Sequence, residues 1–303
     1  MPRHRYIPNS KKNIKILAIW QLIKAAILKS QYSIIERTIF MIKSIPKVIH
    51  YCWFGGNPEP EDVKQCIASW RKILPNYKIK RWDESNYDVH KNQYMSDAYK
   101  EHKWAFVSDY CRIDVVHKYG GIYLDTDVEV IRSFDPLLSE QMFCGFESRD
   151  PLMFRKKKEV EQSVNFGLGF GAIAGHKVLK QILELYENLS FYNKDGSLNL
   201  IACPRYQTQI LKRNGLTDNG ETQRFDNGIA YSAEYFCPLS NITDKMLFLT
   251  DNTYSIHHFS VTWASKEALA ERDLCFKMSH YMGFRLASKI AKLIYIIRKS
   301  LNI

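Results

Sequence analysis

The chain has 303 residues, of which 46% are hydrophobic and 25% are charged, and these proportions exclude a disordered or fibrous protein. The formal net charge is +11, but residues 1–47 hold ten Lys or Arg against one acid and residues 277–303 hold six against none. Because the body between these basic ends is acidic on balance, the charge pattern argues against a nucleic-acid groove across the core, and no nucleic-acid partner is expected.

The N-terminal residues and the cysteines indicate a cytoplasmic protein. The apolar run at 14–28 is interrupted by Lys15, Gln21 and Lys24. It is therefore not expected to be a cleavable signal peptide, and it is short for a membrane span. The seven cysteines form no CxxC pair and are odd in number, so a reducing compartment fits better than a zinc ribbon or a disulfide framework.

The first elements predict a β-α-β unit. Residues 45–56, IPKVIHYCWFGG, have the apolar character of a buried strand that ends at a Gly-Gly turn. Residues 59–74, EPEDVKQCIASWRKIL, carry acids at the start and basic residues at the end, as a helix dipole favours. Residues 77–83, YKIKRWD, alternate like a strand. This order is typical of the opening of an α/β nucleotide-binding domain.

The next stretch joins a helix to a pair of aspartates. Residues 103–121 predict a helix that stops at Gly120-Gly121, and residues 120–130, GGIYLDTDVEV, predict a strand. On one strand Asp125 and Asp127 would share a face roughly 7 Å apart, with a mutual repulsion of about 2 kcal/mol at an effective dielectric near 20. Either a wet strand end or a bound cation would relieve that repulsion.

Two residues of the preceding helix could join the aspartates. Asp109 and Arg112 are three positions apart, so they are neighbours on one helical face. One interpretation is that they simply form an ion pair on the surface. The short connection nevertheless puts them in one helix-turn-strand unit with Tyr123 and the two aspartates. Spacing alone leaves both interpretations open: a surface ion pair, or one site in which these five residues converge.

Later segments give weaker signals. The RKKK run at 155–158 predicts a solvated loop, and the glycines at 165–176 do not form a dinucleotide fingerprint. Residues 255–263, SIHHFSVTW, alternate like a strand, so His257 and His258 face opposite ways and only one can join an inward site. From Tyr281 onward, basic and apolar residues fall on opposite sides of a helix, which suits an anionic membrane surface or packing on the body.

Taken together, three stretches resemble the glycosyltransferase family 32 type of capsular-polysaccharide synthesis, whose core is related to the large glucosylating toxins. These stretches are IPKVIHYCWFGG, WAFVSDYCRIDVVHKYGGIYLDTDVEV and TYSIHHFSVTW. The resemblance covers roughly 45–265 with the motifs in the family's order. It implies an α/β fold of GT-A type with a mixed, mainly parallel sheet. It also implies a divalent ion, usually Mn²⁺ with Mg²⁺ as the alternative, and retaining transfer of a sugar from a nucleotide donor.

The resemblance also assigns residues. Asp125 and Asp127 match the DXD motif that binds the metal and the ribose, and His258 matches the third metal ligand. Val261 stands where the toxins have a serine ligand, and His257 competes with His258. Trp53 matches the residue that stacks on the nucleobase, Asp109 and Arg112 match the pair that holds the donor sugar and phosphate, and Tyr123 matches a donor contact beside the DXD. The catalytic residues that the resemblance implies are Asp109, Arg112, Asp125 and Asp127. Asn165 and the glycines after it match no motif residue but could line the acceptor side.

The expected enzyme is a hexosyl- or N-acetylhexosaminyltransferase with a UDP-sugar, rather than a GDP-sugar, as donor. Its acceptor would be a saccharide, in capsular or other surface polysaccharide synthesis. The chain is expected to divide into a basic helical segment at 1–44, a catalytic domain at 45–265 and a basic amphipathic helical segment at 266–303. The two basic segments are expected to lie on the inner face of the cell membrane, near a lipid-linked acceptor. The alternatives are a haloacid-dehalogenase-type phosphatase, whose nucleophile strand also reads DxD, and a noncatalytic membrane-associated binding protein.

Overall fold

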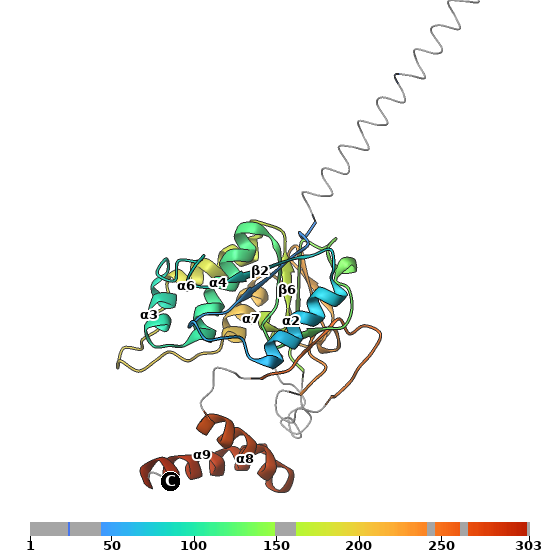
Figure 1. The fold of residues 1–303 in the computed structure, drawn as a ribbon. Coiled ribbons are helices and arrows are strands. Elements are labelled where there is room, and N and C mark those ends of the chain that lie inside the picture. The colour runs from blue at the N-terminus through green and yellow to red at the C-terminus, as the bar shows by residue number, and fades with distance from the viewer. Residues whose placement is uncertain (1–23, 25–43, 149–161, 241–245, 261–265, 302–303) are drawn as a thin grey trace, which may run out of the picture. The chain divides into compact units, whose positions relative to one another are not determined.

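The computed structural model describes residue 24 and residues 44–148, 162–240, 246–260 and 266–301 (Figure 1). Nearly all of the basic N-terminal segment, the run at 155–158, Val261 and Trp263 lie outside the described residues. One of the two compact units of the chain extends from Ile45 to Ile303 and contains all the helices and strands described below. The predicted three-part division of the chain stays a prediction.

A seven-stranded sheet of order β2-β1-β3-β6-β5-β8-β7 forms the centre of the body. Its strands are β1 (Val48–Cys52), β2 (Lys78–Trp82), β3 (Gly121–Tyr123), β5 (Met142–Gly145), β6 (Phe170–Ala172), β7 (Gln223–Phe225) and β8 (Gly228–Tyr231). Strand β1 pairs in parallel with β2 and β3, and β5 in parallel with β8, whereas β6 and β7 run antiparallel to their neighbours. The expected α/β fold with a mixed, mainly parallel sheet is confirmed, since all strands of the sheet except β6 and β7 run in one direction.

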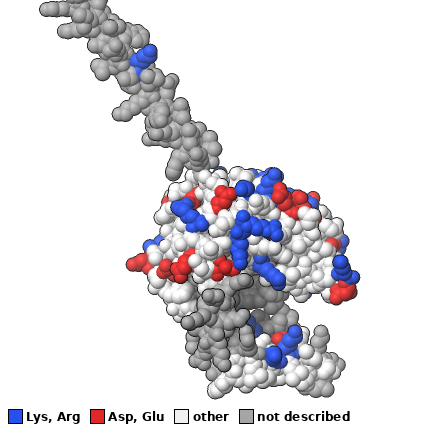
Figure 2. Space-filling model, turned by 180° about the vertical axis from the view of Figure 1, so that it is seen from behind, with Lys and Arg blue, Asp and Glu red and all other residues white. Residues whose placement is uncertain are grey.

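Helices cover both faces of this sheet because neighbouring strand residues point to opposite sides. Ile122 joins the core that α2 (Glu61–Ile73) covers, whereas Tyr123 joins the core beneath the other helices. Those helices are α3 (Gln93–Lys100), α4 (Trp104–Tyr119), α6 (Lys177–Glu187) and α7 (Cys203–Arg213), and the short 3-10 turns are η1 (Asp135–Leu137), η2 (Phe166–Leu168) and η3 (Ala233–Tyr235). Figure 2 shows basic and acidic side chains interspersed on one side of this body.

A separate two-stranded ribbon lies beside the main sheet. Strand β4 (Val128–Val130) pairs antiparallel with β9 (Ser255–His257). Helix α2 fixes the ribbon, since Trp70 Nε1 donates to the carbonyl of Val128 at 2.7 Å and the Val130 amide donates to Ser69 Oγ at 2.9 Å. The ribbon therefore holds a segment from near the end of the body beside the DXD stretch.

The prediction of one continuous strand through residues 120–130 is wrong. Strand β3 ends at Tyr123 in the main sheet, and β4 begins at Val128 in the ribbon. The residues between them make a turn in which the Val128 amide donates to the carbonyl of Asp125 at 3.1 Å. Asp125 and Asp127 are therefore neighbours across a turn rather than along one strand face.

The C-terminal residues form two consecutive helices, α8 (Lys266–Met282) and α9 (Phe284–Leu301), joined at Gly283 with φ +77°. Ala287 and Ala291 of α9 pack with Cys275 of α8. The larger apolar side chains Leu286 and Leu293 remain about half exposed, at 51% and 55%. Among the described residues, no helix is both long and apolar enough to cross a membrane.

Candidate functional site

Four elements bring the predicted residues together at one edge of the main sheet. Helix α4 supplies Asp109 and Arg112, strand β3 supplies Tyr123, and the turn after β3 supplies Asp125. Strand β9 adds a histidine from more than a hundred residues further along the chain. This is the carboxyl end of the parallel strands β1 and β3, where open α/β sheets bind their ligands.

A buried guanidinium holds two carboxylates. Arg112 Nη2 lies 3.0 Å from Asp109 Oδ1 and 3.3 Å from Asp125 Oδ1, and its side chain is only 5% exposed. The guanidinium carbon also lies 4.9 Å from the ring centre of Tyr123. A buried charge of this kind is retained only when it is paired. The alternative of a surface pair between Asp109 and Arg112 is therefore excluded.

The two carboxylates respond differently to this arrangement. Burial raises the pKa of Asp109, and the Arg112 charge only partly opposes it. Burial would also raise the pKa of Asp125, but the charge of Arg112, followed by His257, outweighs it and leaves that pKa below its ordinary value. Asp125 therefore stays ionised, as a metal ligand must.

Further contacts fix the orientation of Asp125. The Tyr123 hydroxyl donates to Asp125 Oδ1 at 2.9 Å, and the Asp125 amide donates to the carbonyl of Gly167 at 3.2 Å. A Cβ atom on Gly167 would overlap Asp125 Oδ2, so only glycine allows this approach. The Gly167 amide in turn donates to Asn165 Oδ1 at 2.7 Å.

Asp125, Asp127 and His257 form a group with metal-binding character. One ligand atom from each lies within 4.8 Å of the others. Among the described residues, this is the group of three potential ligands whose atoms lie close enough together to hold a metal ion. His257 Nε2 lies 3.3 Å from Asp127 Oδ1 and 3.8 Å from Asp125 Oδ2. Two carboxylate oxygens and an imidazole nitrogen suit Mn²⁺ and similar ions. The residues present therefore fit the expected ion.

The position of His258 requires a correction. In the ribbon His257 lies opposite Val128, and both are buried. His258 follows with the opposite orientation, and its Nε2 lies 3.0 Å from Glu129 Oε2. The alternation of the strand allows one inward histidine, and the resemblance matches His258 to the third ligand with His257 as its competitor; the backbone pairing puts His257 inward instead.

Trp53 lies just beyond the end of β1, at the same edge of the sheet. Its side chain is partly buried, and its Nε1 donates to the carbonyl of Asn57 at 2.6 Å. The Trp53 amide continues the pairing with Trp82. Its assigned role, stacking on a nucleobase, stays a prediction.

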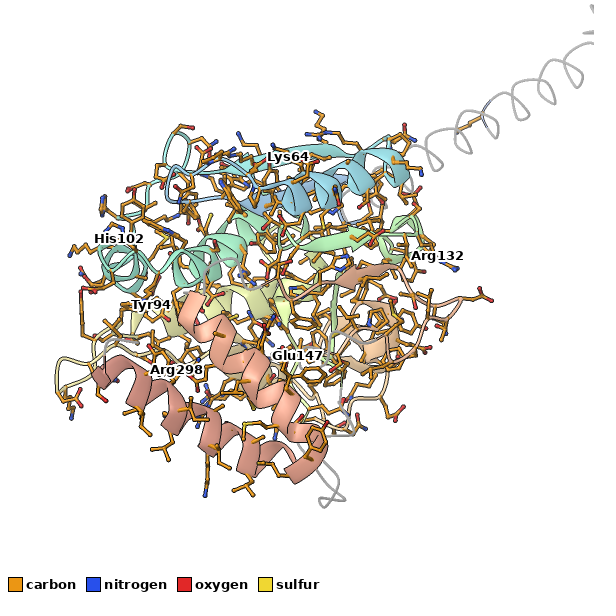
Figure 3. The ribbon with its side chains drawn as sticks, turned by 60° about the horizontal axis from the view of Figure 1, so that its bottom comes forward. Lys64, Tyr94, His102, Arg132, Glu147 and Arg298 are labelled. Atoms are coloured by element: carbon orange, nitrogen blue, oxygen red, sulfur yellow. The ribbon has the colours of Figure 1, made fainter. Side chains whose placement is uncertain are left out.

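The sequence gives no signal for two other residues of the site. Asn165 Nδ2 donates to Glu147 Oε1 at 2.9 Å, and Glu147 is labelled in Figure 3. Burial raises the pKa of Glu147, while the Asn165 hydrogen bond and the charge of His257 oppose the rise. The Ser260 amide donates to Asp127 Oδ2 at 2.9 Å. Glu147 stands in no motif, and Ser260 lies in the TYSIHHFSVTW stretch but contacts Asp127 through its backbone amide, so only their position in space identifies them.

Comparison with known proteins places the DXD turn inside a recognised region. Residues 60–144 match the family model described as "Glycosyltransferase sugar-binding region containing DXD motif". Inositol phosphoceramide mannosyltransferase 3 of Schizosaccharomyces pombe is 37% identical over 103 residues, which are 31% of this chain and 28% of that protein. Mannosyl phosphorylinositol ceramide synthase SUR1 of Saccharomyces cerevisiae is 32% identical over 103 residues, 33% of this chain and 27% of that protein. The chain thus matches little more than a quarter of either relative.

Similar solved structures include glycosyltransferases. The PaToxG glycosyltransferase has a TM-score of 0.41 at 21% identity, covering 61% of this chain and 77% of that chain. The galactosyltransferase LgtC, in complex with donor and acceptor sugar analogs, has a TM-score of 0.38 at 13% identity, covering 72% of this chain and 90% of that chain.

We expect Gly167→Ala to weaken Mn²⁺ binding by about tenfold or more, because the new methyl group must displace the Asp125 carboxylate from the group of three. Isothermal titration calorimetry with MnCl₂ measures this effect. Gly228→Ala is the control, since its methyl group meets only the Phe225 ring. Equal loss of Mn²⁺ binding in both variants would indicate general destabilisation and contradict the assignment.

We expect Mn²⁺ affinity to fall by about tenfold per pH unit below the pKa of His257, because a protonated imidazole cannot bind a metal. Burial lowers the pKa of His257, but the charges of Asp127 and Asp125 outweigh it and raise the pKa above 6.5 in the metal-free protein. Affinity is therefore highest above that raised pKa and is lost as the pH falls through it. Calorimetry between about pH 6 and pH 8 tests this, with His257→Gln expected to flatten the profile.

Proposed function

We propose that the protein is a metal-dependent, retaining glycosyltransferase that moves a sugar from a nucleotide-sugar donor to a saccharide acceptor. The group of Asp125, Asp127 and His257, with Arg112 behind it, is the observation that carries the proposal. Two carboxylates, an imidazole and a buried guanidinium at one edge of an α/β sheet suit a diphosphate ligand with its cation. The match of residues 60–144 to a DXD sugar-binding region supports the same conclusion.

The chain's own residues have distinct proposed roles. Asp127 and His257 hold the ion, and Asp125 holds it or the ribose from a position fixed by Tyr123. When bound, the ion supplies neutralising charge for the diphosphate leaving group. Arg112 provides donors for the sugar or phosphate from a guanidinium that is already oriented by Asp109. Since no further carboxylate is assigned as a nucleophile, we favour attack of the acceptor on the same face that the leaving group departs from.

Two observations bear on the class of donor, and they favour different sugar nucleotides. The toxin-like motifs favour a UDP-hexose, with N-acetylhexosamine as the further possibility. The curated relatives are named for mannosyl transfer to inositol phosphoceramide, so GDP-mannose is the direct competitor. The role in capsular or other surface polysaccharide synthesis rests on the resemblance of the motifs alone.

We expect Asp127→Asn to lower donor-dependent release of nucleoside diphosphate by at least about a hundredfold, because one metal ligand loses its charge. The assay uses Mn²⁺ with a panel of UDP-hexoses, UDP-N-acetylhexosamines and GDP-mannose. Asp251→Asn is the matched control, since that side chain is fully exposed on the surface.

The same assay, with phosphate monoesters added to the panel of substrates, separates the transferase from the phosphatase and from a noncatalytic binding protein. Release of inorganic phosphate from monoesters, with no turnover of any nucleotide sugar, would support the phosphatase and overturn the transferase. Mn²⁺-dependent binding of a donor without turnover would support a noncatalytic binding protein.

We also propose that the protein is cytoplasmic and peripheral on the inner face of the membrane, where its saccharide acceptor is linked to lipid. Helix α9 supports this, since Leu286, Leu293 and Ile297 recur along one stripe and are about half exposed. Lys289 and Lys292 lie close to the stripe and are exposed. Apolar side chains beside basic ones suit an anionic lipid surface, where each basic residue contributes about 1 kcal/mol.

We expect the triple variant Leu286→Gln, Leu293→Gln and Ile297→Gln to bind vesicles containing phosphatidylserine at least about tenfold more weakly than the wild type, because the inserted apolar area is lost. Vesicle sedimentation measures this effect. Leu200→Gln with Leu249→Gln is the control, since both side chains are exposed and neither residue belongs to α9. Unchanged sedimentation of the triple variant would contradict the membrane assignment of α9.

A further inference from the structure

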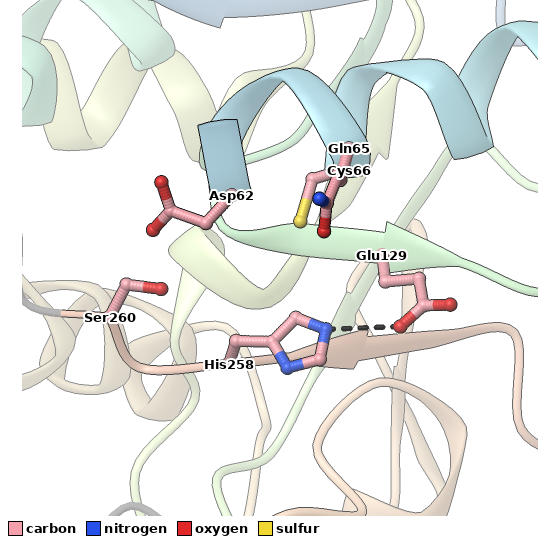
Figure 4. Close-up of a pocket in the computed structure, with 6 residues that line it drawn as sticks. All are labelled: Asp62, Gln65, Cys66, Glu129, His258 and Ser260. Atoms are coloured by element: carbon pink, nitrogen blue, oxygen red, sulfur yellow. Dashed lines mark hydrogen bonds and ion pairs between the residues drawn. The ribbon is translucent and has the colours of Figure 1, made fainter. Parts of the chain in front are cut away.

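A cavity lies beside the DXD turn, on the side of the β4–β9 ribbon that faces away from His257. Its volume is about 340 Å³, which is within the range of small-molecule sites. Figure 4 shows that α2 forms one wall and that β4, β9 and the residues after β9 form the other. The residues that line it are Asp62, Gln65, Cys66, Glu129, His258 and Ser260. None of them is assigned above to the donor.

The backbone that forms this wall also holds Asp127. The His258 amide donates to the carbonyl of Asp127 at 2.9 Å, and the Ser260 amide donates to Asp127 Oδ2 at 2.9 Å. His257 faces the metal-binding group, whereas His258 faces the cavity (Figure 4). The cavity and the group of Asp125, Asp127 and His257 are therefore neighbours that share the backbone at Asp127.

The chemistry of the lining selects the class of ligand. It contains two carboxylates, an amide, an imidazole and a hydroxyl, and no Lys or Arg is among these described lining residues. Carboxylates accept hydrogen bonds from hydroxyl groups, and two of them repel a phosphate or another acid. Asp62 also lies in the first turn of α2, so it offsets the positive end of the helix dipole that would otherwise attract an anion.

Two observations indicate that the polar groups of the lining are accessible to a ligand. Glu129 and His258 are paired at 3.0 Å but keep 43% and 40% of their side chains exposed. Asp62 and Gln65 are exposed on the outer turns of α2. Cys66 is buried beneath them, and burial together with the charges of Asp127, Glu129 and Asp62 raises the pKa of its thiol to about 12. The thiol therefore stays neutral and contributes surface rather than charge.

We propose that this cavity is the acceptor subsite and that it binds a neutral, hydroxyl-rich sugar unit through Asp62, Gln65, Glu129 and His258. The inference rests on the proposed function and adds the class of acceptor to it. A sugar phosphate is excluded by the two carboxylates, so any phosphate or lipid portion of the acceptor extends out of the cavity. In this proposal, the wall shared with Asp127 brings the bound sugar close to a donor at the DXD turn.

The test compares two neighbouring acids of α2. Asp62 lines the cavity, whereas Glu61 is exposed, pairs loosely with Lys64 at 3.8 Å and is not among the residues that line this cavity. The variants are Asp62→Asn and Gln65→Ala, with Glu61→Gln as the matched control. The probes are methyl α-mannoside and methyl α-galactoside as neutral acceptors, and mannose 6-phosphate as the charged one.

We expect Asp62→Asn and Gln65→Ala to raise the KM for the neutral acceptor by about tenfold, because the first replaces a charged hydrogen-bond acceptor by a neutral amide and the second removes a hydrogen-bonding side chain. The KM for the donor, measured from its hydrolysis without acceptor, should stay within about twofold of the wild-type value. Glu61→Gln should leave both unchanged. A rise in the donor KM alone would overturn the proposal, as would tighter wild-type binding of mannose 6-phosphate than of the methyl hexosides.

Direct binding keeps this test separate from the proposed function. Saturation-transfer NMR with a methyl hexoside, at equal protein and Mn²⁺ concentrations, reports occupancy of the cavity without turnover. If no donor is turned over but the signal is lost in Asp62→Asn, the acceptor subsite stands and the transferase proposal fails. If donors are hydrolysed but the signal is the same in wild type and variants, the subsite is wrong and the transferase proposal stands.

Discussion

The buried guanidinium of Arg112 is the interaction on which the arrangement of the candidate site depends. It lies between Asp109 on its own helix and Asp125 on the turn after β3, so it joins α4 to the loop that carries the DXD motif. A charge without solvent must be paired, and each partner here is held by further contacts. Arg112 is therefore the largest influence that keeps Asp125 ionised, with His257 as a second, and Tyr123 and the backbone of Gly167 fix the orientation of that carboxylate.

The second constraint is the small ribbon of β4 and β9. It starts immediately after Asp127 and ends at His257, so it closes the metal-binding group with a residue distant in sequence. Because consecutive residues of a strand point to opposite sides, the two adjacent histidines serve two separate places. His257 faces the metal-binding group, and His258 faces the cavity lined by Asp62 and Glu129. The donor and acceptor proposals thus share one structural element.

The candidate site also explains why glycine is required within residues 165–176. The spacing of these glycines fits no nucleotide fingerprint, and the structure gives them a different purpose. At Gly167 the backbone approaches the Asp125 carboxylate so closely that a side chain is excluded. Asn165 caps the same turn and holds Glu147. These residues support the DXD turn from behind, which fits a role in shaping the site rather than in binding phosphate.

The sequence by itself determined the local units: the β-α-β opening, the helix ending at Gly120, and the short connection that puts Asp109, Arg112, Tyr123, Asp125 and Asp127 in one helix-turn-strand unit. These follow from periodicity and short connections, which act over a few residues. Only the tertiary structure decided that the DXD residues lie on a turn, that Arg112 is buried, and that His257 rather than His258 completes the group. Those outcomes depend on the pairing of β4 with a strand more than a hundred residues away and on burial by packed helices, which no local pattern encodes.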